Sequence, residues 1–416
     1  AAGVRIWGIS ATIGNLDEAA RMLFGSDRYD NYKLIKANIK KEIEVIPLIP
    51  DNPEKFPWAG RQGLKMVNEV VPVIMNSKTT LIFTNTRSQC ELWYRTLLEK
   101  EPELAGRIAM HHGSLSRDLR SWVEKALHTE KLKAVVCTAS LDLGVDFRPV
   151  QTVIQIGSPK GVARFSQRAG RSGHQPGEVS RIYFVPTHSL ELIESAALRQ
   201  ALKEDYLESG TPYLRSFDVL VQYLTTLATG TVFHEELIFH EVAGTHCFGE
   251  ITPEEWAWCL NFIVTGGASL QSYDEYKKVT RIENGLYKVQ SKRTAMRHRL
   301  QIGTIVSDAS LQVKFVSGGR IGTIEESFIS KLEPGETFWF AGRSLELVRF
   351  KGMTVEVKAS KSKTGKVPSW QGGRMPLSSN LAELLRRKLY EAGTGQCADP
   401  EWKALAPLIQ FQKERS

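Results

Sequence analysis

The sequence predicts an α/β domain, followed by a winged-helix-like module and a β-rich C-terminal domain. Between residues 65 and 195, short apolar β-prone runs alternate with helical patterns, as in a parallel sheet. Further along, a helical region precedes two β-prone runs joined by Asn284-Gly285, the strongest short-range hairpin signal. From residue 302 to residue 357, short β-prone runs alternate with turns, which favours a small barrel or a curled antiparallel sheet.

Composition narrows the classes of protein that fit. The 416 residues are 42% hydrophobic and 24% charged, as in ordinary globular proteins, and their number predicts two to four domains. No apolar run approaches the roughly 20 residues of a membrane span. The five cysteines include no Cys-x-x-Cys pair, so we expect neither a disulfide framework nor a metal cluster, and the compartment is predicted to be reducing. The N-terminus does not resemble a secretory signal and looks internal to a longer protein.

The N-terminal part is predicted to contain one strand, one helix and a linker. Residues 4–9 are apolar and β-prone, Asn15 is a candidate N-cap, and residues 16–23 have helical periodicity. The polar, lysine-containing passage over residues 36–50 is interpreted as an interdomain linker. The α/β region that follows has helices predicted over residues 88–99 and 115–127 and strands over residues 81–83, 107–110, 133–137, 152–156 and 181–185.

After about residue 195 the pattern changes. A helix is predicted over residues 217–227, and Thr252-x-x-Glu255 is a capping box that opens a helix through Ile263. Helices followed by a hairpin suggest a winged helix with the hairpin as its wing, and a generic α+β linker domain is the alternative. In the β-rich region, turns are predicted at residues 317–320, 333–335 and 350–352. A polar helix over residues 379–392 then leaves the domain without a convincing closing element.

The net charge of +8 comes from one region of the chain. Residues 271–375 contain 19 Lys and Arg against 10 Asp and Glu, and the remaining residues are almost neutral. Such a stretch can form a face that binds a polyanion, because phosphate contacts release condensed counterions. A solvated face that keeps the protein soluble explains the charge equally well. Charge alone leaves both interpretations open.

Two short segments of the α/β region carry candidate chemistry. In residues 138–146, small and hydroxyl side chains after a strand let backbone amides approach phosphates, and Asp146 can accept hydrogen bonds from a ribose hydroxyl. In residues 167–174, Arg168 and Arg171 are three residues apart beside two glycines that permit close approach. They can present a guanidinium to a transferring phosphoryl group, with Arg171 as the arginine finger.

In this order along the chain, the motifs resemble a known family. Ser10-Ala11-Thr12, residues 81–87, His111 to Leu115, residues 138–146 and Gln167 to His174 look like helicase superfamily 2 motifs III to VI. Residues 175–192 and 367–373 are similar to large helicase-related (Lhr) proteins, more narrowly to their bacterial ligase-associated DEXH-box branch. The resemblance covers essentially the whole chain.

The resemblance implies an ATP-dependent motor that moves 3′ to 5′ on single-stranded DNA, in the bacterial cytoplasm. It implies the end of a first RecA-like domain of the P-loop NTPase type over residues 1–45, a second RecA-like domain over 46–198, a winged helix over 199–292 and a β-rich accessory domain, incomplete, over 293–416. ATP with Mg²⁺ is the implied cofactor. Single-stranded DNA or a DNA- or RNA-containing duplex is the implied partner, with a possible link to DNA ligase and DNA repair.

Site residues follow from the same resemblance, motif by motif. Gln167 and Arg171 would face the ATP phosphates, whereas Gly144, Asp146 and Arg168 would bind the nucleotide. Ser10 and Thr12 would couple the ATP and strand sites. The tracking strand would be held by Arg87, Ser114 and Thr138, and Trp370 would stack on a base. Core packing is the alternative for Trp370, because most tryptophans are largely buried.

Two departures from the family pattern limit this hypothesis. His174 stands where many superfamily 2 proteins have a second arginine, although a histidine looks normal for this branch. More importantly, the 416 residues contain no Gly-x-x-x-x-Gly-Lys-Ser/Thr and no Asp-Glu-x-His, so the main ATP and Mg²⁺ ligands are missing. We therefore expect a helicase fragment that is inactive alone. A non-hydrolysing nucleic-acid-binding module and an RNA helicase are the alternatives.

Overall fold

The computed structural model describes most of the chain, in two units that are treated separately below. One unit joins Ala1–Ala37 with Ser209–Ser307, and the other joins Asn38–Glu208 with Asp308–Ser416. The described residues are 5–10, 12–25, 32–36, 42–50, 63–142, 150–173, 178–267, 276–300, 310–362, 364–370, 376–395 and 397–414. Gly144, Asp146 and His174 lie outside them.

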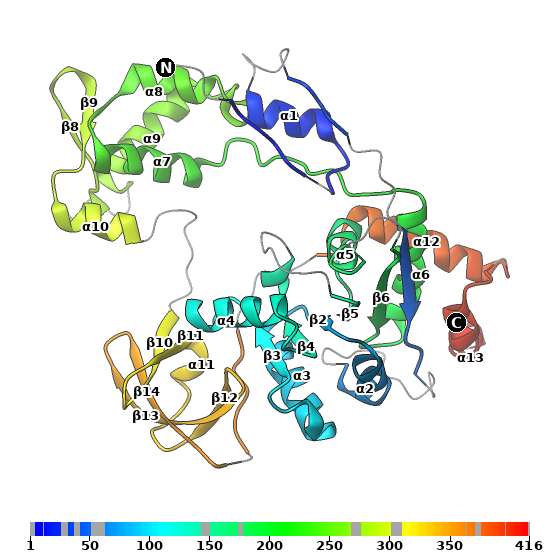
Figure 1. Ribbon diagram of the computed structural model, residues 1–416. Coiled ribbons are helices and arrows are strands. Elements are labelled where there is room, and N and C mark those ends of the chain that lie inside the picture. The colour runs from blue at the N-terminus through cyan, green and yellow to red at the C-terminus, as the bar shows by residue number, and fades with distance from the viewer. Residues whose placement is uncertain are drawn as a thin grey trace. The chain divides into compact units, whose positions relative to one another are not determined.

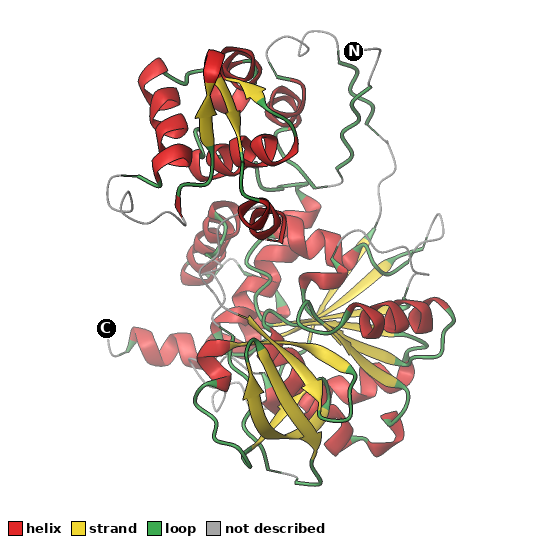
Figure 2. Cartoon of the chain, turned by 90° about the vertical axis from the view of Figure 1, so that its left-hand side faces the viewer, coloured by secondary structure: helices red, strands yellow, loops and turns green. Residues whose placement is uncertain are grey.

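A six-stranded, wholly parallel sheet organises the α/β domain of the larger unit (Figures 1 and 2). The strand order is β1-β6-β5-β2-β4-β3. The strands are β1 (Ile43–Pro47), β2 (Thr80–Phe83), β3 (Ile108–His111), β4 (Ala134–Cys137), β5 (Thr152–Ile156) and β6 (Ser180–Val185). The five strands predicted between residues 81 and 185 are therefore confirmed to within a residue or two at each end.

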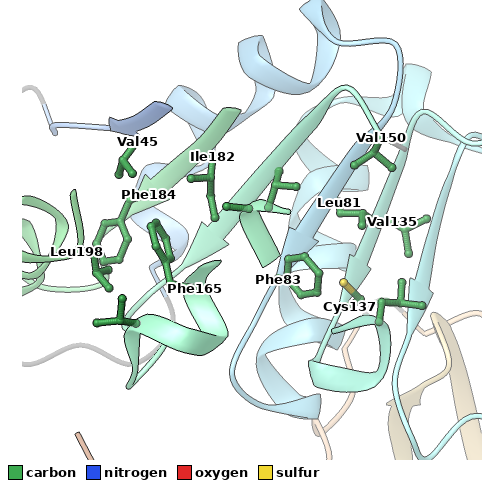
Figure 3. Close-up of a cluster of buried hydrophobic side chains, with 14 of the residues drawn as sticks. Val45, Leu81, Phe83, Val135, Cys137, Val150, Phe165, Ile182, Phe184 and Leu198 are labelled. Carbon is green, nitrogen blue, oxygen red and sulfur yellow. The ribbon is translucent and has the colours of Figure 1, made fainter. Parts of the chain in front are cut away.

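Helices cover both faces of this sheet because successive strand residues point to opposite sides. Leu81 and Phe83 of β2 join the core under α4, α5 and α6, whereas Ile82 packs with α2 and α3. Figure 3 shows the first core, in which the rings of Phe165 and Phe184 meet edge to face at 6.4 Å. The helices are α2 (Val67–Asn76), α3 (Arg87–Lys100), α4 (Arg117–His128), α5 (Val162–Ala169) and α6 (Leu190–Lys203).

Two N-terminal predictions are wrong. The expected linker over residues 36–50 contains β1, which pairs in parallel with β6 at the edge of the sheet, with Val45 opposite Ile182. The expected strand over residues 4–9 does not form in its described part, residues 5–9, where Trp7 and Ile9 are exposed. A strand needs a neighbour for its backbone N–H and C=O groups, and no described segment pairs with this one.

The β-rich domain is a curled five-stranded sheet in the order β11-β10-β14-β13-β12 (Figure 2). The sheet is not closed into a barrel, since β11 and β12 are its two edge strands. Strands β10 and β14 pair in parallel, and the other strand pairs of the sheet are antiparallel. Phe338, Phe340 and Leu345 fill its concave core. The elements are β10 (Ser310–Phe315), β11 (Arg320–Glu325), α11 (Glu326–Ile329), β12 (Thr337–Phe340), β13 (Arg343–Lys351) and β14 (Thr354–Ala359).

The last helices return to the α/β domain rather than completing the β-rich one. Leu381 and Leu384 of α12 (Ser379–Gly393) lie fully buried in the core beside α6. Near α13 (Pro400–Lys413), Arg199 of α6 donates to Asp399 at 2.9 Å and to Glu401 at 2.8 Å. Helices α12 and α13 therefore pack on the α/β domain, whereas the predicted accessory domain over residues 293–416 includes them.

The smaller unit contains the predicted helices and hairpin. Its helices are α1 (Leu16–Phe24), α7 (Phe217–Gly230), α8 (Glu235–Ala243), α9 (Pro253–Thr265) and α10 (Lys292–Leu300), and its strands are β7 (Phe233–His234), β8 (Thr280–Ile282) and β9 (Leu286–Lys288). The capping box of Thr252 and Glu255 is confirmed. Ile282 pairs with Leu286, so the hairpin loop has three residues, and two of them, Asn284 and Gly285, have positive φ values of 60° and 68°. Helix α10 packs on α7, so the winged helix extends past residue 292.

Candidate nucleotide and nucleic-acid site

The predicted strand-holding residues lie at the carboxyl ends of adjacent parallel strands. Arg87 follows β2, Ser114 follows β3 and Thr138 follows β4, so all three are at the same edge of the sheet. Arg87 Nη1 donates to Ser114 Oγ at 2.9 Å, and the backbone N–H of Thr138 donates to the carbonyl of His111 at 3.2 Å. The structure therefore brings these three predicted residues together.

The β-rich domain is bonded directly to this edge. The carbonyl of Ser114 accepts from Thr323 N at 2.8 Å, and Ser116 N donates to the carbonyl of Ile321 at 3.0 Å. The loop after β3 therefore pairs with β11 in antiparallel fashion. Gly322 permits this approach, because a Cβ there would overlap the Ser114 carbonyl oxygen. Ser114 is only 2% exposed as a result. Arg87 and Thr138, both half-buried, are the more accessible of the three.

A buried carboxylate that sequence reasoning missed fixes the same domain to α3. Glu91 is 3% exposed and accepts from the backbone N–H groups of Ala341 at 2.8 Å and Gly342 at 3.2 Å. His112 Nε2 lies 3.2 Å from the same carboxylate. No sequence signal could reveal this role, because the backbone amides that Glu91 binds belong to the β12–β13 turn, about 250 residues further along the chain.

Trp370 is packed against this junction. Its ring lies edge-on to His112 at 5.9 Å between centroids and is tilted toward Phe340 at 6.5 Å. The residue is half-buried beside the core of the β-rich domain. Part of the residue therefore packs internally and part of it reaches the surface, and stacking on a base stays a prediction.

Arg168 has a structural role, which corrects its prediction as a nucleotide-binding residue. The side chain is 1% exposed. Its guanidinium forms a bidentate pair with Asp142, at 2.9 and 3.2 Å, and donates to Gln155 Oε1 at 2.7 Å. It also lies over the ring of Phe83 at 4.8 Å. These contacts hold α5 onto the sheet and occupy the guanidinium inside the domain.

Arg171, in contrast, keeps an accessible surface. It follows the end of α5, is half-buried, and donates from Nη2 to the backbone carbonyl of Asp142. Burial lowers the pKa of its guanidinium, and the Asp142 carboxylate partly opposes this effect. Gln167, on α5, is half-buried as well. Asp142 thus links the two arginines, through its side chain to Arg168 and through its backbone to Arg171.

The opposite end of α5 is held by a second carboxylate that the sequence did not single out. Glu208 accepts from Val162 N at 2.5 Å and Ala163 N at 2.6 Å, the first amides of the helix. Ser378, which caps α12, donates from Oγ to the same carboxylate at 2.7 Å. Because Ser209 begins the other unit, the chain leaves the α/β domain at this contact.

The structure says less about the remaining predicted residues, Ser10, Thr12, Gly144 and Asp146. Ser10 is exposed and Thr12 half-buried, with Thr12 N donating to Ser10 Oγ at 3.4 Å, and both belong to the smaller unit. Gly144 and Asp146 are outside the described residues. Within the described part of the chain, no helix is long and apolar enough to cross a membrane.

One cluster has atoms spaced for a metal ion. Ligand atoms of Glu391, Cys397 and Asp399 lie within 4.8 Å of one another. Lys388 Nζ already donates to Glu391 at 3.0 Å and to Asp399 at 2.9 Å, and Arg199 also binds Asp399. These cations lower the pKa of Asp399 to about 2 against the effect of burial. The cluster is best explained as an ion-pair network that attaches the C-terminal segment.

Comparisons with known proteins agree with this arrangement. Residues 64–175 match the family model of the helicase conserved C-terminal domain, and residues 200–367 match that of the large helicase-related protein winged helix domain. The chain is 33% identical over 397 residues to the ATP-dependent helicase Lhr-Core of Sulfolobus acidocaldarius, covering 94% of this chain and 44% of that protein. It is 23% identical to the Lhr helicase/uracil glycosylase of Escherichia coli, covering 93% and 28%.

Solved structures show the same fold. The helicase Lhr of Mycobacterium smegmatis bound to ssDNA and AMP-PNP superposes with a TM-score of 0.64 and 24% identity, over 80% of this chain and 43% of that one. The helicase MrfA bound to DNA gives 0.57 and 19%, over 85% and 45%. The chain spans less than half the length of these relatives, which come from archaea as well as bacteria. The chain belongs to the large helicase-related family and carries its helicase C-terminal and winged helix domains.

Proposed function

We propose that this chain supplies the arginine finger and the strand-holding surfaces of an ATP-dependent DNA translocase. The observation that carries the proposal is the contrast between two arginines of one motif. The Arg168 side chain is buried in the core, whereas the Arg171 side chain, just after the end of α5, is only half-buried. The relatives named ATP-dependent helicases support the same activity.

ATP with Mg²⁺ would be held mainly by residues outside these 416, since they contain no phosphate-cradling loop. When bound, it supplies a γ-phosphoryl group whose transfer to water releases free energy. Arg171 fits the role of donor to that group, because it follows the end of α5 and its side chain is half-buried rather than enclosed in the core as that of Arg168 is. Gln167 would face the same phosphates. We also propose that Gly144 and Asp146 contact the nucleotide, and that Ser10 and Thr12 couple the two sites.

The strand would pass the carboxyl edge of the sheet. Arg87 and Thr138 would contact its phosphates, and Ser114 would act chiefly by orienting Arg87, with which it shares a hydrogen bond. Trp370 would offer the accessible part of its ring to a base, which suits binding without sequence preference. Single-stranded DNA is the proposed partner. We also propose that the motor moves from 3′ to 5′ along this strand and unwinds DNA duplexes or duplexes that contain RNA. Its proposed role is in DNA repair, beside a DNA ligase.

Arg171→Ala tests the proposal in the full-length protein that contains this chain. An arginine finger contributes roughly 10³- to 10⁵-fold to phosphoryl transfer, so DNA-stimulated ATP turnover should fall by about that factor. Binding of a single strand should change less than twofold. Arg181→Ala is the matched control, because Arg181 is an exposed arginine of the same domain paired with Glu44. Turnover that survives Arg171→Ala would exclude the finger, and faster movement on an RNA loading strand than on DNA would exclude the DNA assignment.

A further inference from the structure

The structure divides the basic stretch of residues 271–375 into two parts with different electrostatic environments. In the β-rich domain, three cations pair with nearby acids. Arg349 pairs with Glu356 at 2.6 Å and Lys358 with Glu346 at 2.8 Å. Lys366 pairs with Glu336 at 2.7 Å. From residue 308 to residue 375 the sequence has 11 Lys and Arg against seven Asp and Glu, so acids offset part of the positive charge here.

The winged-helix part has few acids to match its cations. From residue 271 to residue 307 the sequence contains eight Lys and Arg and three acids, Asp274, Glu275 and Glu283. Arg281 pairs with Glu235 of α8 at 3.2 Å. Lys292 and Arg293 form no ion pair with any residue that the structure describes. Helix α10 therefore carries four cations, Lys292, Arg293, Arg297 and Arg299, and no acid, and it lies in the same unit as the β8–β9 hairpin (Figure 1).

Helix α10 exposes its cations, and one of them, Arg299, also donates from Nη2 to the Thr229 carbonyl of α7 at 2.8 Å. At 100° per residue, Lys292, Arg293, Met296, Arg297 and Arg299 fall on an arc of about 160°, and all five are exposed. The other side, with Ala295 and His298, packs on α7, where His298 Nε2 lies 2.8 Å from Thr226 Oγ1. We call the surface formed by Lys278, Lys292, Arg293, Arg297 and Arg299 the α10 basic surface.

Burial and mutual repulsion make the positive charges at this surface electrostatically unfavourable in the protein without a ligand. Burial lowers the pKa of Lys278, and the like charge of Arg297 lowers it further. Burial also lowers the pKa of His298, with Lys278 adding to the effect. Cations in the first turn of a helix, as at Lys292 and Arg293, oppose the helix dipole. A polyanion bound at the surface would remove these repulsions.

We propose that the α10 basic surface binds the phosphate backbone of duplex DNA, separately from the strand-holding edge of the α/β domain. This inference rests on the proposed function for the identity of the nucleic acid. Surfaces that hold single strands interleave cations with aromatic side chains on which bases stack. The outward arc of α10 contains Met296 and no aromatic residue. Recognition here is therefore through phosphates alone, which are present at the highest density on a duplex.

The 416-residue chain itself is the protein to test. Fluorescence anisotropy with a labelled 20-base-pair duplex, and with one of its strands alone, would be recorded between 50 and 200 mM NaCl. Combining Lys292→Ala with Arg293→Ala should weaken duplex binding and reduce the slope of log K against log salt by about 0.9 for each lost phosphate contact. Lys358→Ala, which removes a cation already paired with Glu346, is the control and should leave the slope unchanged.

The outcomes separate this inference from the proposed function. An unchanged slope in the double variant, or no binding by the wild-type chain at 50 mM salt, would overturn the α10 basic surface. A larger loss with the single strand than with the duplex would overturn the assignment to duplex. Because the measurement uses no ATP, failure of the Arg171→Ala test leaves it interpretable. The double variant should unfold at a temperature no lower than the wild type, since both side chains are exposed and their removal relieves an unfavourable interaction with the helix dipole.

Discussion

Replacing Arg168 with alanine should destabilise the α/β domain far more than replacing a surface arginine. The substitution would leave the Asp142 carboxylate, 6% exposed, without its cation, and the fully buried Gln155 without a donor. An uncompensated buried ion costs about 3–5 kcal/mol. An unpaired buried carbonyl adds about 1–3 kcal/mol. The free energy of unfolding should therefore fall by at least about 4 kcal/mol.

Urea denaturation followed by circular dichroism at pH 7 measures this loss. Arg181→Ala is the control, because Arg181 forms an ion pair with Glu44 in which both side chains are about half exposed. Such exposed pairs contribute less than about 1 kcal/mol to the free energy of unfolding. Combining Asp142→Ala with Arg168→Ala should cost less than the sum of the two single changes, since it removes both charges. If Arg168→Ala destabilised no more than Arg181→Ala, the structural role of Arg168 would be refuted.

Three further substitutions test other contacts. Burial raises the pKa of Glu194 to about 7, so the folded state binds more protons and its stability should fall as pH rises from about 4.5 to 7. Between pH 5 and pH 8 the titration of Glu194 should lower the free energy of unfolding of the wild type by about 2.5 kcal/mol. Urea titrations of Glu194→Gln should lack this decrease, and equal decreases for both proteins would contradict the burial effect. Gly322→Ala should push β11 from the Ser114 carbonyl and accelerate hydrogen exchange at the Ser116 amide; unchanged protection would show that the sheet tolerates a Cβ. Glu208→Ala should lower the free energy of unfolding by about 1–2 kcal/mol through loss of the α5 cap, whereas Ser209→Ala should not, and identical stabilities would argue against the cap.

Local chemistry explains why much of the fold could be predicted. Central strands of a parallel sheet are buried on both faces, so β2, β4 and β5 are short apolar runs that stand out against their surroundings. The capping box before α9 and the Asn284-Gly285 turn are satisfied by neighbouring residues, so their sequence signals are sufficient. Edge strand β1 escaped prediction because only Val45 of its five residues is buried.

Site predictions were limited by partners that are distant in the sequence. Arg168 and Arg171 look equivalent within their motif, and Asp142 and Gln155, from other elements, determine which of them is buried. Glu91 and Glu208 have no motif at all, because each is defined by backbone amides that approach only after folding. The roles of Ser10, Thr12 and Trp370 stay predictions.

The sequence by itself determined the order of elements, the helicase motifs and the excess of positive charge, because each depends on residues within about twenty positions of one another. Tertiary structure decided which charges are neutralised and where the last helices pack. Cations of the β-rich domain meet acids across strands, whereas those of α10 face outward, and α12 buries Leu381 and Leu384 beside α6. Coulombic pairing and apolar burial depend on distances in space, which spacing along a chain does not specify.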